Sequence, residues 1–143
     1  MSSAVDLIVI GTGVAGLSAA TTARQANVAT TMVESLMFGG LITNINELDG
    51  PVHGNGSEYA ANLMARACDL GAENVSATVE AIERDGDAWC VVTDSQRLRA
   101  RALIVASGAR VRPLGVPGES ELEGSGVSRC ADCDGPMFGG QDV

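Results

Sequence analysis

Val5-Asp-Leu-Ile-Val-Ile10 runs directly into Gly11-Thr-Gly13-Val-Ala-Gly16, and this stretch decides how the chain folds. A continuous apolar run is typical of a strand that is buried on both faces of a parallel sheet. The glycines lead into residues 17–26, where Ala and Thr provide the small side chains of a helix packed closely on a sheet. Residues 29–33 predict a second short strand, which ends at Glu34. Together these segments predict a β-α-β unit.

The glycine spacing lets backbone N–H groups at a helix N-terminus approach a pyrophosphate. Alone the pattern is weak, because a glycine turn also occurs in α/β proteins that bind no nucleotide. Here the pattern lies between a predicted strand and a predicted helix, and Glu34 stands at the end of the next strand. A carboxylate at that place accepts a hydrogen bond from a ribose 2′-hydroxyl and repels a 2′-phosphate. We therefore expect a dinucleotide site.

The segments that follow continue the α/β pattern. Residues 37–51 are rich in glycine and polar side chains, and we interpret them as an ordered loop over a ligand rather than an element. Ser57 is the expected cap of a helix that runs to about Leu70, and Gly71 is its expected stop.

Short strand signals come next and predict a β-meander. They are an alternation at residues 75–79, a turn at Asp85-Gly86, an apolar run at 89–93, and Arg97, Arg99 and Arg101 alternating with apolar residues on a solvated strand face. Residues 103–106 then predict a buried strand that ends in Ser107-Gly108.

These elements predict an α/β fold, a Rossmann-like three-layer domain with a parallel sheet and a β-meander. We assign residues 1–111 to this domain and regard it as incomplete within the 143 residues. After Pro113 the chain becomes rich in glycine and proline. Residues 112–143 are therefore expected to form a connector and the start of a second domain.

Composition excludes several classes of partner. The formal charge is −9 and there is no lysine, which argues against nucleic acid because phosphate binding needs clustered basic side chains. The apolar run at residues 7–10 is far too short to span a bilayer, and no basic leader precedes it. We therefore expect a soluble, cytoplasmic protein with no membrane partner.

Cys130-Ala-Asp-Cys133-Asp134-Gly135 indicates a second chemistry. Two cysteines at this spacing close and reopen a small disulfide ring, and the carboxylate of Asp134 adds an acid/base beside the sulfur. Half of a zinc or iron–sulfur site is disfavoured because the other ligands are missing, and inert core cysteines are disfavoured in so polar a segment. Cys68 and Cys90 are expected to be buried small apolar residues.

The chain resembles the low-molecular-weight bacterial thioredoxin reductases, specifically their N-terminal portion, over essentially all of its length. The resemblance rests on a succession of motifs: the glycine motif, Glu34, Phe38-Gly39-Gly40, Leu103-Ile-Val-Ala-Ser-Gly108 and Cys130-Ala-Asp-Cys133-Asp134-Gly135. A Cys pair placed after the β-meander separates this family from glutathione reductase-like enzymes, whose pair lies near the first β-α-β unit.

The resemblance implies an FAD enzyme in which NADPH reduces the flavin, the flavin reduces the Cys pair, and the pair reduces a protein disulfide such as that of a thioredoxin-like protein. Cys133 would face the flavin, Cys130 would attack the substrate, and Asp134 would be the acid/base. Val79 would lie near the adenine and Gly108 near the pyrophosphate. The implied FAD contacts are Gly11, Thr12, Gly13, Val14, Ala15, Gly16, Glu34, Ser35, Gly39, Gly40, Leu41, Asn46, Val79, Ala106 and Gly108.

Other readings of the same scaffold stay open. The chain carries no second glycine fingerprint, so we expect NADPH to bind only when a further domain is supplied. One alternative is an FAD-dependent dithiol oxidase that passes electrons to oxygen, although Asp134 favours the reductase. Another is a non-catalytic FAD-binding or partner-docking module. A homodimer, or association with a second chain, is the expected assembly.

Overall fold

The computed structural model describes residues 5–50 and 54–140, apart from the side chains of residues 132 and 133. The chain divides into two compact units between Gly108 and Ala109. The first unit is a mixed α/β structure of the predicted class, and the second is short and mostly irregular. Within the described ranges, every helix is too short or too polar to cross a membrane.

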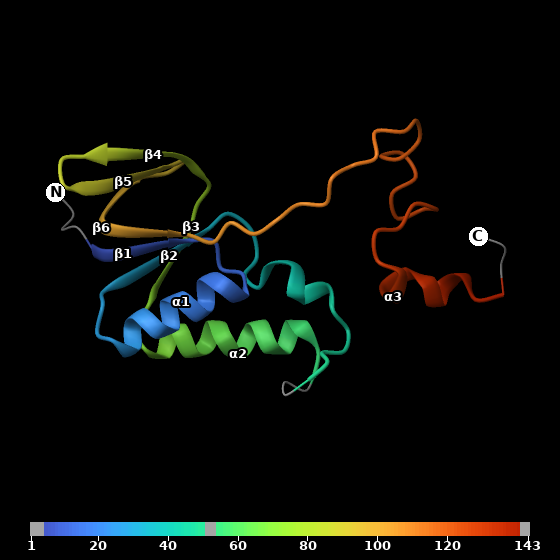
Figure 1. The fold of residues 1–143 in the computed structure, drawn as a ribbon, viewed down its shortest axis with the longest axis horizontal. Helices are drawn as coiled ribbons and strands as arrows, with labels where there is room; N and C mark the ends of the chain where they lie inside the picture. Colours follow the sequence, from blue (N-terminus) through green and yellow to red (C-terminus); the bar gives the residue numbers. More distant parts are fainter. Residues whose placement is uncertain (1–4, 51–53, 141–143) are drawn as a thin grey trace. The chain divides into compact units, whose positions relative to one another are not determined.

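A six-stranded sheet with the order β3-β2-β1-β6-β5-β4 forms the centre of the first unit (Figure 1). The β1, β2, β3 and β6 strands pair in parallel, while β4 and β5 add an antiparallel hairpin beyond β6. The predicted β-α-β unit and meander are therefore both present. The strands are β1 (Val5–Ile10), β2 (Thr30–Glu34), β3 (Glu73–Ser76), β4 (Val79–Asp85), β5 (Ala88–Thr93) and β6 (Arg97–Val105).

The continuous apolar run of β1 faces two different cores. Leu7 and Val9 are buried among side chains of the two long helices. Ile8 and Ile10 point the other way and are buried in a cluster that includes Val91 of the hairpin. Because successive side chains of a strand alternate between faces, all four residues from Leu7 to Ile10 must be apolar. The result is one sheet with a core on each face, the first shared with the helices and the second with the hairpin.

Two helices, α1 (Val14–Gln25) and α2 (Gly56–Asp69), lie side by side on one face of the sheet (Figure 1). The α2 helix is capped by Asn55, whose side chain accepts the N–H of Glu58 at 2.8 Å. The prediction that Ser57 caps this helix is wrong. A side chain just outside the first turn reaches the free N–H groups of that turn, whereas Ser57 already lies within the helix.

The α2 helix ends as predicted at Gly71. This glycine has φ +87°, and its N–H donates to the carbonyl of Cys68 at 2.8 Å. The next residue, Ala72, donates to the carbonyl of Ala67 at 3.0 Å. Together these bonds satisfy carbonyl groups at the helix end, and a glycine adopts the required left-handed conformation without a steric penalty.

The structure corrects three details of the predicted elements. The loop at residues 37–51 contains a 3₁₀ helix, η1 (Gly40–Asn44). The alternation at residues 75–79 is split between β3, which pairs with β2, and β4, which pairs with β5. The last strand of the meander and the predicted strand at 103–106 are one continuous strand, β6.

The end of β6 is more exposed than predicted. Ile104 and Val105 are 37% and 63% exposed. The pairing with β5 stops at Ala100, so among the described residues the rest of β6 has a strand, β1, on one side only. An apolar sequence therefore indicates a strand, but burial depends on whether a neighbour covers it.

The two cysteines outside the dithiol motif are free thiols in different surroundings. Cys90 of β5 is 2% exposed, as expected for a small apolar residue. Cys68 is exposed, and the prediction of burial is wrong. The buried face of α2 is centred on Ala60 and Ala67, and the position after Ala67 is turned about 100° away from it on a helix of 3.6 residues per turn.

The arginine row of β6 is solvated, as predicted, and each guanidinium has an acidic partner. Arg97 pairs with Glu83, and the Arg99 Nε lies 2.9 Å from a carboxylate oxygen of Asp85. Arg101 lies 3.4 Å from Asp6. The first two pairs join β6 to β4 across β5, and the third joins β6 to the neighbouring β1. Each is an exposed ion pair, which contributes little to stability.

The second unit holds two short helical turns, α3 (Ala131–Asp134) and η2 (Gly135–Phe138). Upstream, Glu123 and Val127 form an isolated bridge. The carboxylate of Glu119 accepts the N–H groups of Leu114 and Gly115 at 3.0 and 2.8 Å, so side-chain hydrogen bonds replace regular pairing in this segment.

Candidate dinucleotide site and dithiol turn

The glycine loop lies at the carboxyl ends of the central strands. The N–H of Gly11 donates to the carbonyl of Val33 in β2 at 2.8 Å, and the N–H of Ala106 donates to the carbonyl of Ile10 at 2.8 Å. The loop is therefore bonded on both sides before α1 begins. In open α/β sheets, ligands bind outside the carboxyl ends of the strands, where this loop lies.

The outer two glycines of the motif are required by the fold itself. Gly11 has φ +98°, and a Cβ there would lie 2.4 Å from the carbonyl oxygen of Ala106. A Cβ on Gly16 would lie 1.9 Å from the carbonyl oxygen of Gly11. A side chain at either position would therefore collide with backbone that cannot move freely.

Gly13 is different, because no contact among the described residues requires a glycine there. Its backbone is extended (φ −71°, ψ −179°), which any residue adopts. The nearest atom to a Cβ built on it is the carbonyl oxygen of Gly39, at an ordinary contact distance of 3.8 Å. The space beside Gly13 is therefore open to a group that approaches the backbone at the start of α1. This fits a bound pyrophosphate.

Glu34 faces this loop from the end of β2. Its Oε2 atom accepts the backbone N–H of Thr12 at 2.9 Å and the Thr12 hydroxyl at 3.2 Å. Its Oε1 atom accepts the N–H groups of Ser35 and Leu36 at 2.9 and 3.1 Å. The carboxylate predicted from the sequence is therefore held beside the glycine loop in a fixed orientation.

The same contacts determine the ionisation of Glu34. Partial burial raises its pKa, but the hydrogen bonds from Thr12, Leu36 and Ser35 outweigh burial and leave the pKa below its ordinary value. The group therefore carries a negative charge at neutral pH. A carboxylate in this state accepts hydrogen bonds from ribose hydroxyls and repels a phosphate on the ribose.

The Gly39–Gly40 segment covers the other side of the loop. The N–H of Gly39 donates to the carbonyl of Thr12 at 2.7 Å, and Gly39 forms an isolated bridge with Gly13. Gly40 has φ +63°, and a Cβ on it would lie 3.4 Å from the Cα of Gly13. The loop at 37–50 therefore lies against the glycine motif.

The remaining predicted contacts come from several different elements. Val14 and Ala15 begin α1, and Ala106 and Gly108 follow β6. Val79 packs on the cluster that contains Ile10 and Val33, at the same end of β1 and β2.

Leu41 and Asn46 are among the predicted contacts that have no described hydrogen bond to the loop. Leu41, in η1, is 57% exposed. Asn46 is exposed, and no hydrogen bond or ion pair within the described ranges joins it to the glycine loop. Their assignment as FAD contacts, like that of the other residues of the site, remains a prediction.

In the second unit, Cys130 is disulfide-bonded. The side chain of Cys133 lies outside the described residues, so its pairing with Cys130 remains a prediction. The N–H of Asp134 donates to the carbonyl of Cys130 at 3.1 Å, which closes a helical turn around the motif. The Asp134 carboxylate is bonded to the hydroxyl of Ser128 at 2.6 Å. The predicted acid/base is therefore tied to the segment that precedes the first cysteine.

Sequence reasoning missed the side chains that shape this turn. Arg129, directly before Cys130, has its Nε 2.8 Å from Glu123 and its guanidinium 3.7 Å from Glu119. A hydroxyl residue two positions before the cysteine was the available signal for Ser128, because serine often bonds nearby backbone in turns.

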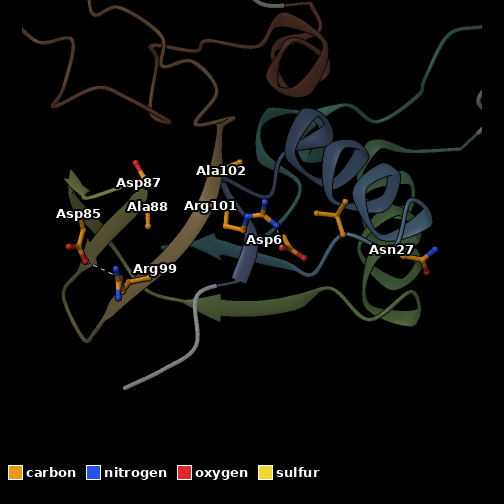
Figure 2. Close-up of a pocket in the computed structure, with 9 residues that line it drawn as sticks. Asp6, Asn27, Asp85, Asp87, Ala88, Arg99, Arg101 and Ala102 are labelled. Atoms are coloured by element: carbon orange, nitrogen blue, oxygen red, sulfur yellow. Dashed lines mark hydrogen bonds and ion pairs between the residues drawn. The ribbon is translucent and has the colours of Figure 1, made fainter.

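A cavity of about 840 Å³ lies elsewhere in the first unit (Figure 2). It is lined by Asp6 at the start of β1, by Asn27 before β2, and by charged residues of the β4–β5 turn and β6. This is the amino-terminal edge of the parallel strands, opposite the glycine loop. Its arginines are paired with its acids, as the contact between Arg99 and Asp85 in Figure 2 shows, so we assign it no role in the predicted chemistry.

The described part of the chain holds no cluster of three or more His, Cys, Asp or Glu side chains suited to a metal ion. What it does hold is a glycine loop between a buried strand and a helix, with a glutamate at the end of the next strand. These features define a Rossmann-like fold with a glycine loop of the kind that binds dinucleotides in other proteins.

Comparison with known proteins refines this class. Residues 5–141 match the pyridine nucleotide-disulphide oxidoreductase family, to which the chain belongs. The thioredoxin reductase of Treponema pallidum (strain Nichols) is 38% identical over 149 residues, which are 100% of this chain and 48% of that protein. The bifunctional thioredoxin reductase/thioredoxin of Mycobacterium leprae (strain TN) is 41% identical, over 96% of this chain and 31% of that protein.

Solved structures agree with these sequence matches. The thioredoxin reductase of Lactococcus lactis (FR conformation) superposes with a TM-score of 0.84 at 34% identity, over 94% of this chain and 45% of that one. The thioredoxin reductase of T. acidophilum gives a TM-score of 0.83 at 28% identity, over 96% and 46%. The expected resemblance to thioredoxin reductases is confirmed, and the chain spans about half the length of several such relatives.

Proposed function

We propose that this chain supplies the FAD-binding residues and the dithiol of a disulfide reductase of the thioredoxin reductase type. The observation that carries the proposal is Gly13, in the loop that Glu34 is bonded to. Among the described residues, only the carbonyl oxygen of Gly39, at 3.8 Å, lies within 4 Å of a Cβ built on it. The family membership and the Cys130–Cys133 motif add the redox chemistry. The cytoplasm is the proposed location, because a reducing compartment suits a catalytic pair.

In this proposal the glycine loop holds the pyrophosphate of FAD and Glu34 holds the adenosine ribose. When bound, FAD supplies a carrier that passes an electron pair between a nicotinamide and the dithiol. The nicotinamide, NADPH, binds only when a further domain is supplied. A homodimer or a second chain is the proposed assembly.

The dithiol then reduces a protein disulfide, with a thioredoxin-like protein as the proposed partner. The Cys130 thiol gives its proton to Asp134 and attacks one partner sulfur as the thiolate. The partner S–S bond breaks, and the sulfur that leaves takes that proton from Asp134. Cys133 next attacks Cys130 in the mixed disulfide. The second partner sulfur leaves and takes the proton that the Cys133 thiol lost, and the Cys130–Cys133 disulfide is restored.

Anaerobic reduction tests the proposal. The chain is loaded with FAD, and dithiothreitol is added while the visible flavin band is recorded. We expect the band to bleach in the wild type and in Cys68→Ser, a control that removes an exposed thiol outside the motif. We expect Cys133→Ser to abolish the bleaching. Equal bleaching in Cys133→Ser would contradict a role for the pair, and dithiol turnover with oxygen alone would indicate an oxidase.

A further inference from the structure

Ser128 lies at the centre of the hydrogen bonds that shape the dithiol turn. Its hydroxyl oxygen is 2.6 Å from Oδ2 of Asp134 and 3.2 Å from the carbonyl oxygen of Cys130. The backbone N–H of Cys130 donates to the same hydroxyl oxygen at 3.1 Å. One side chain therefore touches both the first cysteine and the proposed acid/base.

This hydroxyl has one proton and can donate it to only one of the two acceptor oxygens. A separation of 2.6 Å to a carboxylate lies in the range of charge-assisted O–H···O⁻ bonds, about 2.5–2.7 Å. The distance of 3.2 Å to a neutral carbonyl is long for a hydroxyl donor. Ser128 therefore donates to Asp134 and accepts from the N–H of Cys130.

We propose that Ser128 is a positioning residue, which holds the Asp134 carboxylate beside the dithiol for proton transfer. This inference rests on the proposed function, because it requires Asp134 to act as the acid/base. With Oδ2 bonded to Ser128, Oδ1 is the carboxylate oxygen without a described hydrogen bond, and it is the atom that exchanges a proton with sulfur. The hydrogen bond that the N–H of Cys130 donates to the Ser128 hydroxyl holds this hydroxyl in place.

Asp134 has a second tether that does not pass through Ser128. Its own N–H donates to the carbonyl of Cys130, and that bond involves backbone atoms alone. Removing the hydroxyl therefore leaves this backbone bond of the helical turn in place, frees the Asp134 carboxylate to rotate and takes away the serine acceptor of the Cys130 N–H. The Ser128→Ala variant therefore tests the position of the Asp134 carboxylate while the backbone bond of the helical turn is kept.

Reduction of the disulfide by dithiothreitol tests Ser128 without any flavin. A thiolate of the reagent attacks one sulfur of the Cys130–Cys133 disulfide, and the sulfur that leaves takes a proton. The second reagent thiol then closes a cyclic disulfide, so the protein gains two thiols and the reagent loses two. Quenching with an alkylating agent and mass spectrometry of the cysteine peptides give the rate.

We expect Ser128→Ala to lower this rate roughly tenfold, less than the hundredfold or more that loss of a general acid or base costs. Ser128→Thr keeps a hydroxyl and should restore the rate to within about twofold of the wild type. In an Asp134→Asn background, Ser128→Ala should add no further loss. Ser125→Ala is the matched control, because this exposed serine of the same unit bonds through its backbone N–H, which alanine retains.

Each alternative result has one meaning. If Asp134→Asn reacts at the wild-type rate, the acid/base role in the proposed function fails, and this inference fails with it. If Asp134→Asn is slow but Ser128→Ala is normal, only the inference about Ser128 is overturned. If Ser128→Ala slows the reaction equally with and without Asp134, its effect is structural, and the positioning role is overturned.

Discussion

At the scale of single residues, the glycine motif contains positions of two kinds. Gly11 and Gly16 are needed by the protein, since a Cβ at either would meet backbone atoms at 2.4 and 1.9 Å. Gly13 is not needed by the protein, since a Cβ there meets its nearest atom at 3.8 Å. A sequence pattern treats these glycines alike, and only the structure separates their roles.

Gly13→Ala should therefore separate binding from folding. We expect its free energy of unfolding without ligand to stay within about 1 kcal/mol of the wild type, while affinity for FAD falls at least roughly tenfold because a methyl group occupies the approach to the backbone. Gly16→Ala is the contrast and should cost about 1–3 kcal/mol in stability. Thermal unfolding and FAD titration measure both quantities, and an unchanged FAD affinity in Gly13→Ala would contradict the assignment.

Glu34→Gln tests the carboxylate. In the wild type both carboxylate oxygens accept hydrogen bonds. In the variant the NH₂ group of the amide replaces one of these oxygens and faces N–H or O–H donors that it cannot accept from. We therefore expect the unfolding free energy to fall by about 1 kcal/mol after allowing for solvent screening. Because the native pKa of Glu34 is lowered, its contribution is present above the ordinary carboxyl pKa of about 4.3 and is lost as pH falls through the lower native pKa.

The difference in stability between wild type and Glu34→Gln should therefore be constant near neutral pH and shrink in acid. Chemical denaturation at a series of pH values measures it. A difference that grows as the pH falls would contradict the bonding described for Glu34.

At the scale of elements, the sequence pattern predicts a feature correctly where the feature depends on the residues of that segment alone. The run at 5–10 and the stop at Gly71 were predictable, because burial on two faces and a left-handed helix end each leave a sequence signal. Two features of α2 could not be predicted: which residue caps the helix, and whether Cys68 lies on its buried or its exposed face. Both depend on the residue at which α2 begins, and a shift of one residue changes them. The exposure of the end of β6 depended on a neighbouring strand, which the sequence of β6 does not encode.

The exposed end of β6 predicts edge-to-edge association of this chain. Apolar side chains beside unpaired backbone groups promote pairing with another chain. We expect Val105→Lys to reduce self-association, as measured by sedimentation at increasing concentration. Ile82→Lys is the matched control, because β4 already carries charged residues along its exposed edge. Equal effects of the two changes would contradict a specific role for β6.

At the scale of the whole chain, the division into two units predicts independent stability. The pKa of Glu119 is lowered by the N–H groups of Leu114 and Gly115, although burial opposes this, and the charge of Arg129 adds to the lowering. The contacts of Glu119 in the second unit should therefore hold at neutral pH and weaken as pH falls below the ordinary carboxyl range.

Glu119→Gln should loosen the second unit at neutral pH and leave the first unaffected. Amide hydrogen exchange, followed separately for residues before and after the division at Gly108, measures this. Faster exchange in the strands β1 and β2 of the variant would contradict the independence of the units.

Titration of the chain with FAD tests the central claim most directly, with FMN and ADP as comparison ligands. The claim is that the glycine loop and Glu34 recognise the adenosine diphosphate half of the cofactor. The account predicts that FAD binds, that ADP competes with it, that FMN does not bind, and that Gly13→Ala loses FAD. Binding of FMN as tight as that of FAD, or FAD binding unaffected by ADP and by Gly13→Ala, would contradict it.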